Sequence, residues 1–265
     1  DGDTVWNPGW QPTKTELDSY ECRHGIGYSR FTSSKNGVKA SVLSFVPLND
    51  NCEISQLTLT NGSSEDKKLS IFSYVEWCLW NADDDMKNFQ RNLSTGEVEV
   101  QDSTIYHKTE YRERRNHYAI YSVNTKIDGF DTSRDAFLGA YRGADSPEAV
   151  ANGKCTNSMA SGWSPIASHQ INIDLAAGET KTFIFVLGYI ENPEDEKWES
   201  YGVINKTRAK EMLAKYQTDA QVEDAFAALQ AYWKQLLARY TVDSADDKVN
   251  RMVNTWNQYQ CMVTF

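Results

Sequence analysis

The chain has 265 residues, of which 40% are hydrophobic, and carries a formal net charge of −10. That length and apolar content suffice to bury a core, so the composition excludes a disordered chain. The excess of negative charge disfavours nucleic acid as a partner, because binding a phosphate backbone needs clustered Lys and Arg. No apolar run reaches the roughly 18 residues that a membrane span needs, so we expect a soluble chain without a membrane partner.

The cysteines indicate the compartment. Their number is odd, they are far apart, and none belongs to a Cys-x-x-Cys pair; they are Cys22, Cys52, Cys78, Cys155 and Cys261. This pattern predicts neither a disulfide framework nor a zinc ribbon. A reducing, cytoplasmic location fits it best.

The sequence predicts β-strands over the first 190 residues. Segments with alternating or short apolar runs occur at 37–46, 54–60, 68–75, 96–100, 117–123, 169–175 and 181–190. Turn signals at 34–37 and 61–64 offer Asn or Gly for a positive φ, and 177–179 turns the last pair of strands. So many strands without intervening helices predict a mainly β fold, a large antiparallel β-sandwich over 1–190.

Helices are expected after the polar stretch 191–197. A short helical piece spans about 206–216, and Thr218 with Gln221 forms a capping-box signal for a longer helix. Its apolar stripe predicts core packing: Val222, Phe226, Leu229, Trp233, Leu236, Leu237 and Tyr240. We therefore predict a helical linker over 191–243.

A last helix is expected over 244–265, opened by a second start signal, Ser244 with Asp247. Its apolar face carries Val249, Met252, Val253, Trp256 and Tyr259. The sequence reaches Phe265 without the glycine, proline or polar tail that usually ends a helix. The expectation is a chain cut off as it enters a further domain, with material missing before Asp1 as well.

Metal and nucleotide motifs fail when tested. The acidic run at 83–85 is no calcium loop, because Lys87 stands at a ligand position and Ser94 replaces the bidentate glutamate. The pair Gly25 and Gly27 lacks the third glycine of a dinucleotide fingerprint. The histidines have no metal-ligand spacing and are expected to be surface or hydrogen-bonding residues: His24, His107, His117 and His169. No metal site and no cofactor are expected.

Aromatic content leaves two interpretations open. Eight Trp and 14 Tyr suit sugar recognition, because rings stack on pyranose faces while amides and acids hydrogen-bond hydroxyl groups. A large sandwich also buries many aromatic residues for packing alone. Composition alone does not decide between sugar recognition and core packing.

Several longer stretches of sequence indicate a family more specifically than the composition does. They are WNPGWQP at 6–12, ELDSYECRHG at 16–25, WNA at 80–82, NFQRN at 88–92, YHKTEYRERRNHY at 106–118 and NTWNQYQCMVTF at 254–265. They resemble the N-terminal part of the cellobiose phosphorylases, inverting phosphorylases of glycoside hydrolase family ninety-four. The resemblance implies a galactose-mutarotase-like sandwich, linker helices, and the first helix of a truncated (α/α)6 barrel at 244–265.

The resemblance also implies a reaction. Cellobiose and inorganic phosphate, the co-substrate, are reversibly converted to α-D-glucose 1-phosphate and D-glucose by an inverting single displacement. One aspartic acid protonates the glycosidic oxygen, and phosphate takes the place of the activated water of an inverting hydrolase. That aspartate and the phosphate pocket are expected beyond Phe265, so this chain alone should be inactive. The complete protein is expected to be a homodimer.

One stretch of this chain is expected at the active site. In the resembling family the Asn-x-Gln-Arg-Asn loop reaches the acceptor sugar, which implies an acceptor-site role for Arg91, with Gln90 and Asn88 as weaker candidates. A guanidinium suits this role, because it offers five fixed donors to hydroxyl oxygens. A solvated arginine beside the acidic run 83–85 is the alternative. For the whole chain, a non-catalytic carbohydrate-binding or subunit-pairing sandwich remains the alternative.

Overall fold

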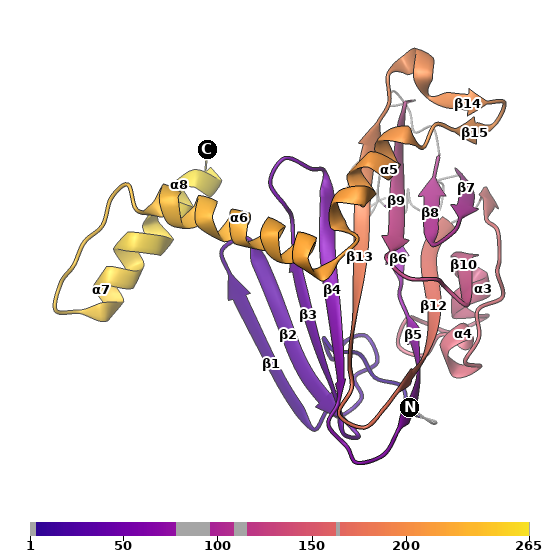
Figure 1. Cartoon of the computed structure of the whole chain (residues 1–265), viewed down its shortest axis with the longest axis horizontal. Helices are drawn as coiled ribbons and strands as arrows, with labels where there is room; N and C mark the ends of the chain where they lie inside the picture. Colours follow the sequence, from indigo (N-terminus) through magenta and orange to yellow (C-terminus); the bar gives the residue numbers. More distant parts are fainter. Residues whose placement is uncertain (1–3, 78–95, 109–115, 163–164, 265) are drawn as a thin grey trace.

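The computed structural model describes residues 4–77, 96–108, 116–162 and 165–264. Two β-sheets stack on each other, and helices follow towards the C-terminus (Figure 1). The predicted fold class, a large antiparallel β-sandwich followed by helices, is confirmed.

The larger sheet has nine strands within the described ranges, in the order β1-β2-β3-β4-β13-β9-β8-β7-β11. Each neighbouring pair is antiparallel. The strands are β1 (Ser19–Gly25), β2 (Tyr28–Lys35), β3 (Val38–Phe45), β4 (Cys52–Asn61), β7 (Gly96–Gln101), β8 (Thr104–His107), β9 (His117–Val123), β11 (Ser161–Gly162) and β13 (Thr180–Glu191).

The smaller sheet is built around β12 (Pro165–Leu175). Its other strands are β10 (Gly129–Ser133), β5 (Lys67–Phe72) and β6 (Val75–Glu76), all of which pair with β12. A separate hairpin, β14 (Trp198–Ser200) and β15 (Val203–Ile204), stands at one end of the molecule (Figure 1).

The main core lies between the two sheets. Successive side chains of a strand point to opposite faces, so the alternation in β4 sends Leu57 and Leu59 towards the smaller sheet. They join one buried cluster with Phe183 from β13 and Ile171 from β12. Burying each such side chain contributes about 1.5–3 kcal/mol. The sequence pattern that predicted the strands therefore also builds this core.

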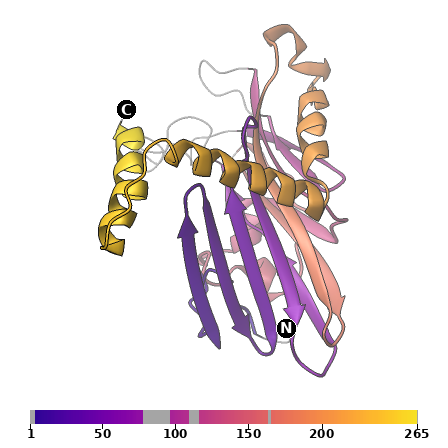
Figure 2. The ribbon, with the colours of Figure 1, turned by 60° about the vertical axis from the view of Figure 1, so that its left-hand side comes forward.

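The opposite face of the larger sheet is covered by helices. They are α5 (Thr207–Leu213), the short η2 (Ala214–Tyr216) and α6 (Asp219–Leu237). Figure 2 shows α6 crossing the strands on this face. Val222 and Leu229 of α6 join a second core cluster with Ile54 and Ile184 of the sheet.

The predicted start of α6 is confirmed. The Thr218 hydroxyl accepts a hydrogen bond from the Gln221 backbone N–H at 3.3 Å, and the Gln221 side chain accepts one from the Thr218 backbone N–H at 3.0 Å. This reciprocal capping box satisfies two donors that a helix start leaves without an intrahelical partner.

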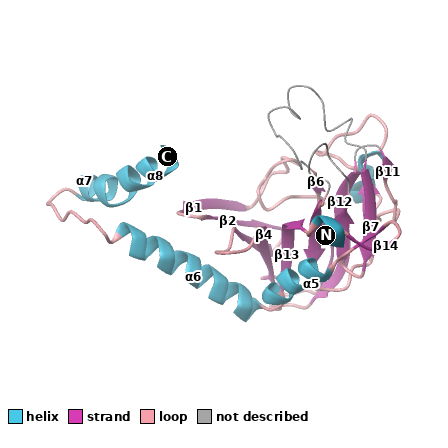
Figure 3. Cartoon of the chain, turned by 90° about the horizontal axis from the view of Figure 1, so that it is seen from above, coloured by secondary structure: helices cyan, strands magenta, loops and turns pink. Residues whose placement is uncertain are grey.

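The last helical run differs from expectation at its start. It comprises α7 (Asp247–Arg251), the π-helical η3 (Met252–Asn257) and α8 (Gln258–Thr264). Asp246, not Ser244, is the N-cap, because its carboxylate accepts from the Lys248 N–H at 2.8 Å. The Ser244 hydroxyl instead donates to the Asn250 side chain at 2.8 Å. Figure 3 shows α6 extending past the β1 side of the sheet, with α7 and α8 beyond it.

Short helices interrupt the strand region, contrary to the expectation of strands alone. They are α3 (Arg134–Leu138) and α4 (Glu148–Ala151), with η1 (Glu194–Glu196) following β13. The Ser133 side chain caps α3, and Phe137 and Leu138 pack with Ile166 of β12. Each helix is shorter than two turns, which is too short for an apolar period to show in the sequence.

The three expected turns differ in their backbone conformation. Asn36 and Gly37 both have positive φ, at 51° and 78°, and Gly178 has φ 76°, as predicted. The chain also turns at 61–64, after the end of β4, but neither Asn61 nor Gly62 has the positive φ that was expected there. The buried Asn61 amide instead donates to the carbonyls of Glu65 and Leu175, at 2.8 and 3.0 Å. Its side chain, not its backbone, shapes that turn.

Candidate functional site

The predicted acceptor residues Arg91, Gln90 and Asn88 lie outside the described residues, in the stretch 78–95. The same holds for the acidic run 83–85 and for Cys78. Their roles stay predictions. The described residues that flank this stretch are Trp77, which follows β6, and Gly96, which begins β7.

Trp77 is packed into the sandwich. Its ring lies 5.4 Å from the His107 ring at the end of β8, and both side chains are buried. Burial lowers the pKa of His107 to about 4, because the charged imidazolium would lose its hydration. This flank therefore forms part of the apolar core and keeps His107 neutral near neutral pH.

A cluster of charges lies beside this flank. Lys108 follows His107, and its Nζ is 3.1 Å from the Glu99 carboxylate and 3.4 Å from that of Glu97. Lys206 forms a second ion pair with Glu99. Burial alone would raise the pKa of Glu99, but hydrogen bonds from Lys206, the Ile204 N–H and Lys108 outweigh it and lower that pKa.

The cluster fixes the β14–β15 hairpin to the larger sheet. Glu99 accepts from the Ile204 backbone N–H at 2.9 Å, and the Lys108 ammonium donates to the Gly202 carbonyl. Because Glu99 is held ionised by two cations, it is unsuited to act as a general acid near neutral pH. The arrangement is that of a structural ion-pair network at the loop-bearing end of the sandwich.

A second carboxylate with several hydrogen bonds is the fully buried Asp131 of β10. Its oxygens accept from the Thr156 and Ser158 hydroxyls at 2.6 and 2.7 Å, and from both backbone N–H groups. These bonds hold the segment after α4 against β10. Nothing in this geometry leaves Asp131 free to transfer a proton.

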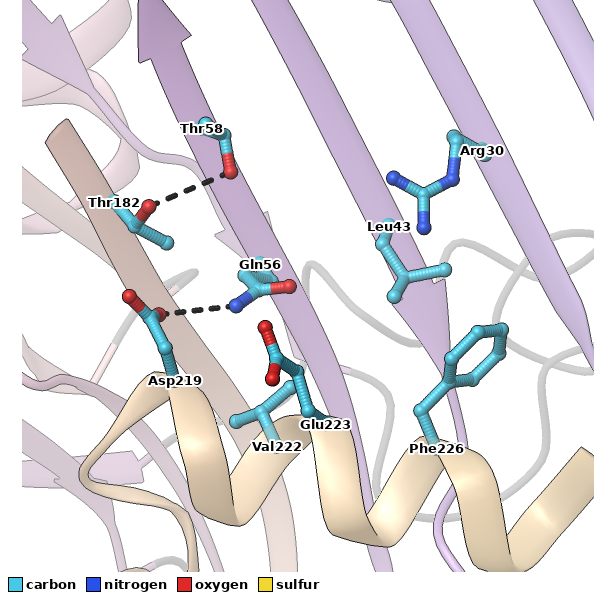
Figure 4. Close-up of a pocket in the computed structure, with 9 residues that line it drawn as sticks. All are labelled: Arg30, Leu43, Gln56, Thr58, Thr182, Asp219, Val222, Glu223 and Phe226. Carbon is cyan, nitrogen blue, oxygen red and sulfur yellow. Dashed lines mark hydrogen bonds between the residues drawn. The ribbon is translucent and has the colours of Figure 1, made fainter. Parts of the chain in front are cut away.

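A groove lies where α6 crosses the larger sheet (Figure 4). Its volume is about 360 Å³, and its lining comes from the sheet and from the first two turns of α6: Arg30, Leu43, Gln56, Thr58, Thr182, Asp219, Val222, Glu223 and Phe226. The Gln56 amide donates to Asp219 at 3.0 Å, and the Thr58 and Thr182 hydroxyls are 3.5 Å apart. These groups could hydrogen-bond a polar molecule.

The groove lacks features expected of a carbohydrate-binding module. None of its lining residues is a tryptophan. Its one ring, Phe226, packs edge-on against Tyr28 with centroids 5.0 Å apart and lies 5.2 Å from Phe45. That ring is occupied by the core, so the groove offers no aromatic platform for a pyranose. The sequence did not predict this groove, because it forms only when segments far apart in the chain meet.

The histidines were expected to be surface or hydrogen-bonding residues, and His169 of β12 is of the second kind. It is fully buried and stacks on Tyr121 of β9 with centroids 5.0 Å apart. It hydrogen-bonds the Ser73 hydroxyl at 3.3 Å through Nδ1, while Nε2 has no partner. Burial lowers the pKa of His169 to about 3. Among the described residues, no group of three or more His, Cys, Asp or Glu could hold a metal ion, and no helix is long and apolar enough to cross a membrane.

Comparison with known proteins gives two adjacent family matches. The glycosyl hydrolase 94 supersandwich domain matches residues 1–219, and the glycosyl hydrolase 94 superfamily catalytic domain matches residues 232–265. The second match covers the end of α6 and the run from α7 to α8. The structure shows a sandwich followed by helices, and the second match assigns the last of these helices to the start of the catalytic domain.

Individual relatives are longer than this chain. An N,N′-diacetylchitobiose phosphorylase of Vibrio furnissii is 31% identical over 96% of this chain and 30% of its own length. A solabiose phosphorylase of Paenibacillus borealis is 29% identical over 97% of this chain and 32% of its own length. An aldose epimerase homologue from C. elegans is 11% identical with a TM-score of 0.40, over 66% of this chain and 69% of that one.

The chain thus spans about a third of the length of these two phosphorylases. A family match over residues 1–219, which is most of the chain, is sufficient for assignment. The chain belongs to the glycosyl hydrolase 94 family, of which it contains the supersandwich domain and the start of the catalytic domain.

Proposed function

We propose that the complete protein is a disaccharide phosphorylase, which transfers a glycosyl group from a disaccharide to inorganic phosphate. The observation that carries this proposal is the pair of family matches, sandwich first and catalytic domain second, along one chain. Two relatives that match nearly all of this chain are named as phosphorylases. In this proposal the described residues supply the sandwich and the helices that lead into the catalytic domain.

The proposed reaction is an inverting single displacement. A carboxylic acid protonates the glycosidic oxygen while phosphate attacks the anomeric carbon from the opposite face. Glu99 and Asp131 are held by hydrogen bonds within networks of the sandwich and do not serve as that acid. We therefore place the catalytic aspartate, as the resemblance implies, in the catalytic domain beyond Phe265.

Arg91 is the residue of this chain that we propose for substrate binding, with Gln90 and Asn88 beside it. The chain connects this stretch to Trp77 and to Gly96. Trp77 is packed in the core, and Gly96 begins a strand of the larger sheet, so both ends of the stretch are tied to the sandwich. The guanidinium and the two amides would donate hydrogen bonds to hydroxyl groups of the acceptor sugar.

Cellobiose is the substrate that the sequence resemblance favours. The two relatives above are instead named for N,N′-diacetylchitobiose and solabiose, so the sugar needs a direct test. The complete protein should be incubated with phosphate and each of these three disaccharides, and the products should be followed by phosphorus and proton NMR. We expect phosphate-dependent release of an α-configured sugar 1-phosphate, fastest from cellobiose.

Two outcomes would change the proposal in different ways. Faster turnover of N,N′-diacetylchitobiose or solabiose would keep the phosphorylase activity but replace cellobiose as the substrate. Phosphate-independent hydrolysis, or no reaction with any disaccharide, would overturn the phosphorylase activity itself.

The location and assembly remain part of the proposal. Cys22, Cys52, Cys155 and Cys261 are free thiols, which fits a reducing cytoplasm. A homodimer of the complete protein is the assembly that the resemblance implies. Light scattering of the purified protein would decide it, because a monomeric mass would contradict the dimer.

A further inference from the structure

The edge strand β1 carries a cysteine and a histidine in direct contact. The Sγ of Cys22 lies 3.1 Å from Nε2 of His24, and Nδ1 of His24 lies 2.8 Å from the hydroxyl of Ser29. Cys22 and His24 are two residues apart on one strand, so they share a face of the sheet. Ser29 of β2 is the direct cross-strand partner of His24.

These three side chains have the order of a nucleophile, a base and a group that orients the base. In the tautomer that donates Nδ1–H to Ser29, the Nε2 lone pair faces the thiol and can take its proton. The His24 ring is further held edge-on to Phe31, with centroids 6.1 Å apart. The geometry therefore places an imidazole nitrogen within hydrogen-bond reach of the thiol.

The site is open to small molecules. Cys22 is partly exposed and His24 is exposed, and among the described strands β1 pairs with β2 alone. Tyr20 precedes the pair on the same face, whereas Glu21 and Arg23 form their own ion pair on the other face. A reagent can thus approach Cys22 without displacing a charged partner.

The other described cysteines provide a contrast. Cys52 and Cys155 are buried, and burial raises the pKa of each thiol to about 12, which suppresses the reactive thiolate. Cys261 is exposed, but its helix α8 contains no histidine. Cys22 alone of these four combines exposure with an imidazole in contact.

We propose that Cys22, His24 and Ser29 form a reactive-thiol site that exchanges with low-molecular-weight disulfides. His24 takes the proton of Cys22, and the thiolate sulfur attacks one sulfur of the disulfide. The old S–S bond breaks as the new one forms, and the other half leaves as a thiolate that recovers the proton from His24. The product is a mixed disulfide on β1, which a thiol reductant reverses.

The test uses glutathione disulfide as the probe on the folded 265-residue chain, in moderate salt that screens exposed charges. Peptide mapping by mass spectrometry gives a separate rate for each cysteine, including Cys78. We expect Cys22 to form the adduct at least about tenfold faster than Cys261, a modest effect beside the 10²–10⁴-fold typical of general-base catalysis. His24→Gln should remove this advantage.

Controls keep the result interpretable. Arg23→Gln, on the opposite face of the same strand, should leave the rate at Cys22 within twofold. In denaturant the rates at Cys22 and Cys261 should converge, because the contact with His24 exists only in the folded strand. Equal rates at the two cysteines in the folded chain, or an unchanged rate in a folded His24→Gln variant, would overturn the site.

Discussion

The apolar stripe of helix α6 is buried near the start of the helix and exposed near its end. Val222 and Leu229 of α6 expose 0% and 5% of their surface, because they pack on the larger sheet. Two turns later Leu236 exposes 38%, and Tyr240 beyond the helix exposes 61%. One continuous stripe in the sequence therefore has a core partner as far as Trp233, but Leu236 and Tyr240 are exposed.

This difference coincides with the family boundaries. The supersandwich match ends at residue 219, and the catalytic-domain match begins at residue 232. Trp256 and Met252 in the last helical run are also exposed, at 55% and 54%. An apolar stripe thus predicts that a helix packs, but not against which domain. Substitutions in the packed and in the exposed regions should therefore have different effects.

The largest loss of stability is expected inside the sandwich, at Glu99. Glu99→Gln removes the charge that balances Lys108 and Lys206, whose side chains are almost fully buried. Leaving buried charges uncompensated should lower the free energy of unfolding by about 3–5 kcal/mol. Urea denaturation of the chain measures this loss.

Glu97→Gln is the matched control, because Glu97 also pairs with Lys108 but is mostly exposed. It should cost no more than about 1 kcal/mol. Equal effects of the two substitutions would show that the network is not anchored at Glu99.

The buried and the exposed part of the α6 stripe should lose different amounts of stability when a leucine is truncated to alanine. Leu229→Ala removes a packed core side chain and should cost about 2–5 kcal/mol in the isolated chain. Leu236→Ala on the same stripe should change stability by less than about 0.5 kcal/mol there. Urea unfolding of both variants tests this, and a similar cost for both would refute the division of α6. In the complete protein we expect the cost at Leu236 to rise.

Arg91 should matter for catalysis and not for the sandwich. In the complete protein, Arg91→Ala should weaken use of the acceptor sugar by about 1.5–3 kcal/mol, the range for a hydrogen bond to a charged group. The measurement is kcat/KM for the acceptor in the synthetic direction. Lys87→Ala in the same stretch is the control and should leave it unchanged. Unaltered acceptor kinetics in Arg91→Ala would contradict the proposed role.

The sandwich should also show a pH dependence, which is small for each pH unit. The pKa of His169 falls from about 6.5 when unfolded to about 3 when folded, so the unfolded chain binds the extra proton between these values. Stability is therefore fully present above pH 6.5 and is lost as the pH falls, by up to about 1.4 kcal/mol per pH unit. His169→Phe should reduce the slope of unfolding free energy against pH by one proton. An unchanged slope would mean that His169 is not the group that titrates.

Local patterns predicted the fold well where the deciding contacts are near in sequence. The capping box of Thr218 and Gln221 and the positive φ of Asn36 and Gly37 depend on a few adjacent residues. Ser244 was a plausible cap, but the nearer carboxylate of Asp246 bonds the first helical turn. Competition between two neighbouring caps is settled by backbone geometry that the sequence does not show.

Long-range features could not be predicted. The burial of His169 depends on Tyr121 from another sheet, and the groove in Figure 4 needs α6 to cross β4 and β13. The Cys22–His24 contact spans only two residues, but no strand was predicted over Ser19–Gly25, so the sequence did not place the two side chains on one face. The acceptor residues at 88–91 came from resemblance alone, and they lie outside the described residues.

The most direct test of the central proposal compares two proteins in one phosphorolysis assay. The complete protein and the isolated residues 1–265 are each given cellobiose with and without phosphate, and glucose 1-phosphate is quantified. We predict phosphate-dependent formation of α-D-glucose 1-phosphate by the complete protein and none by 1–265. Formation of glucose 1-phosphate by 1–265 alone would contradict our assignment of catalysis to the missing part of the catalytic domain.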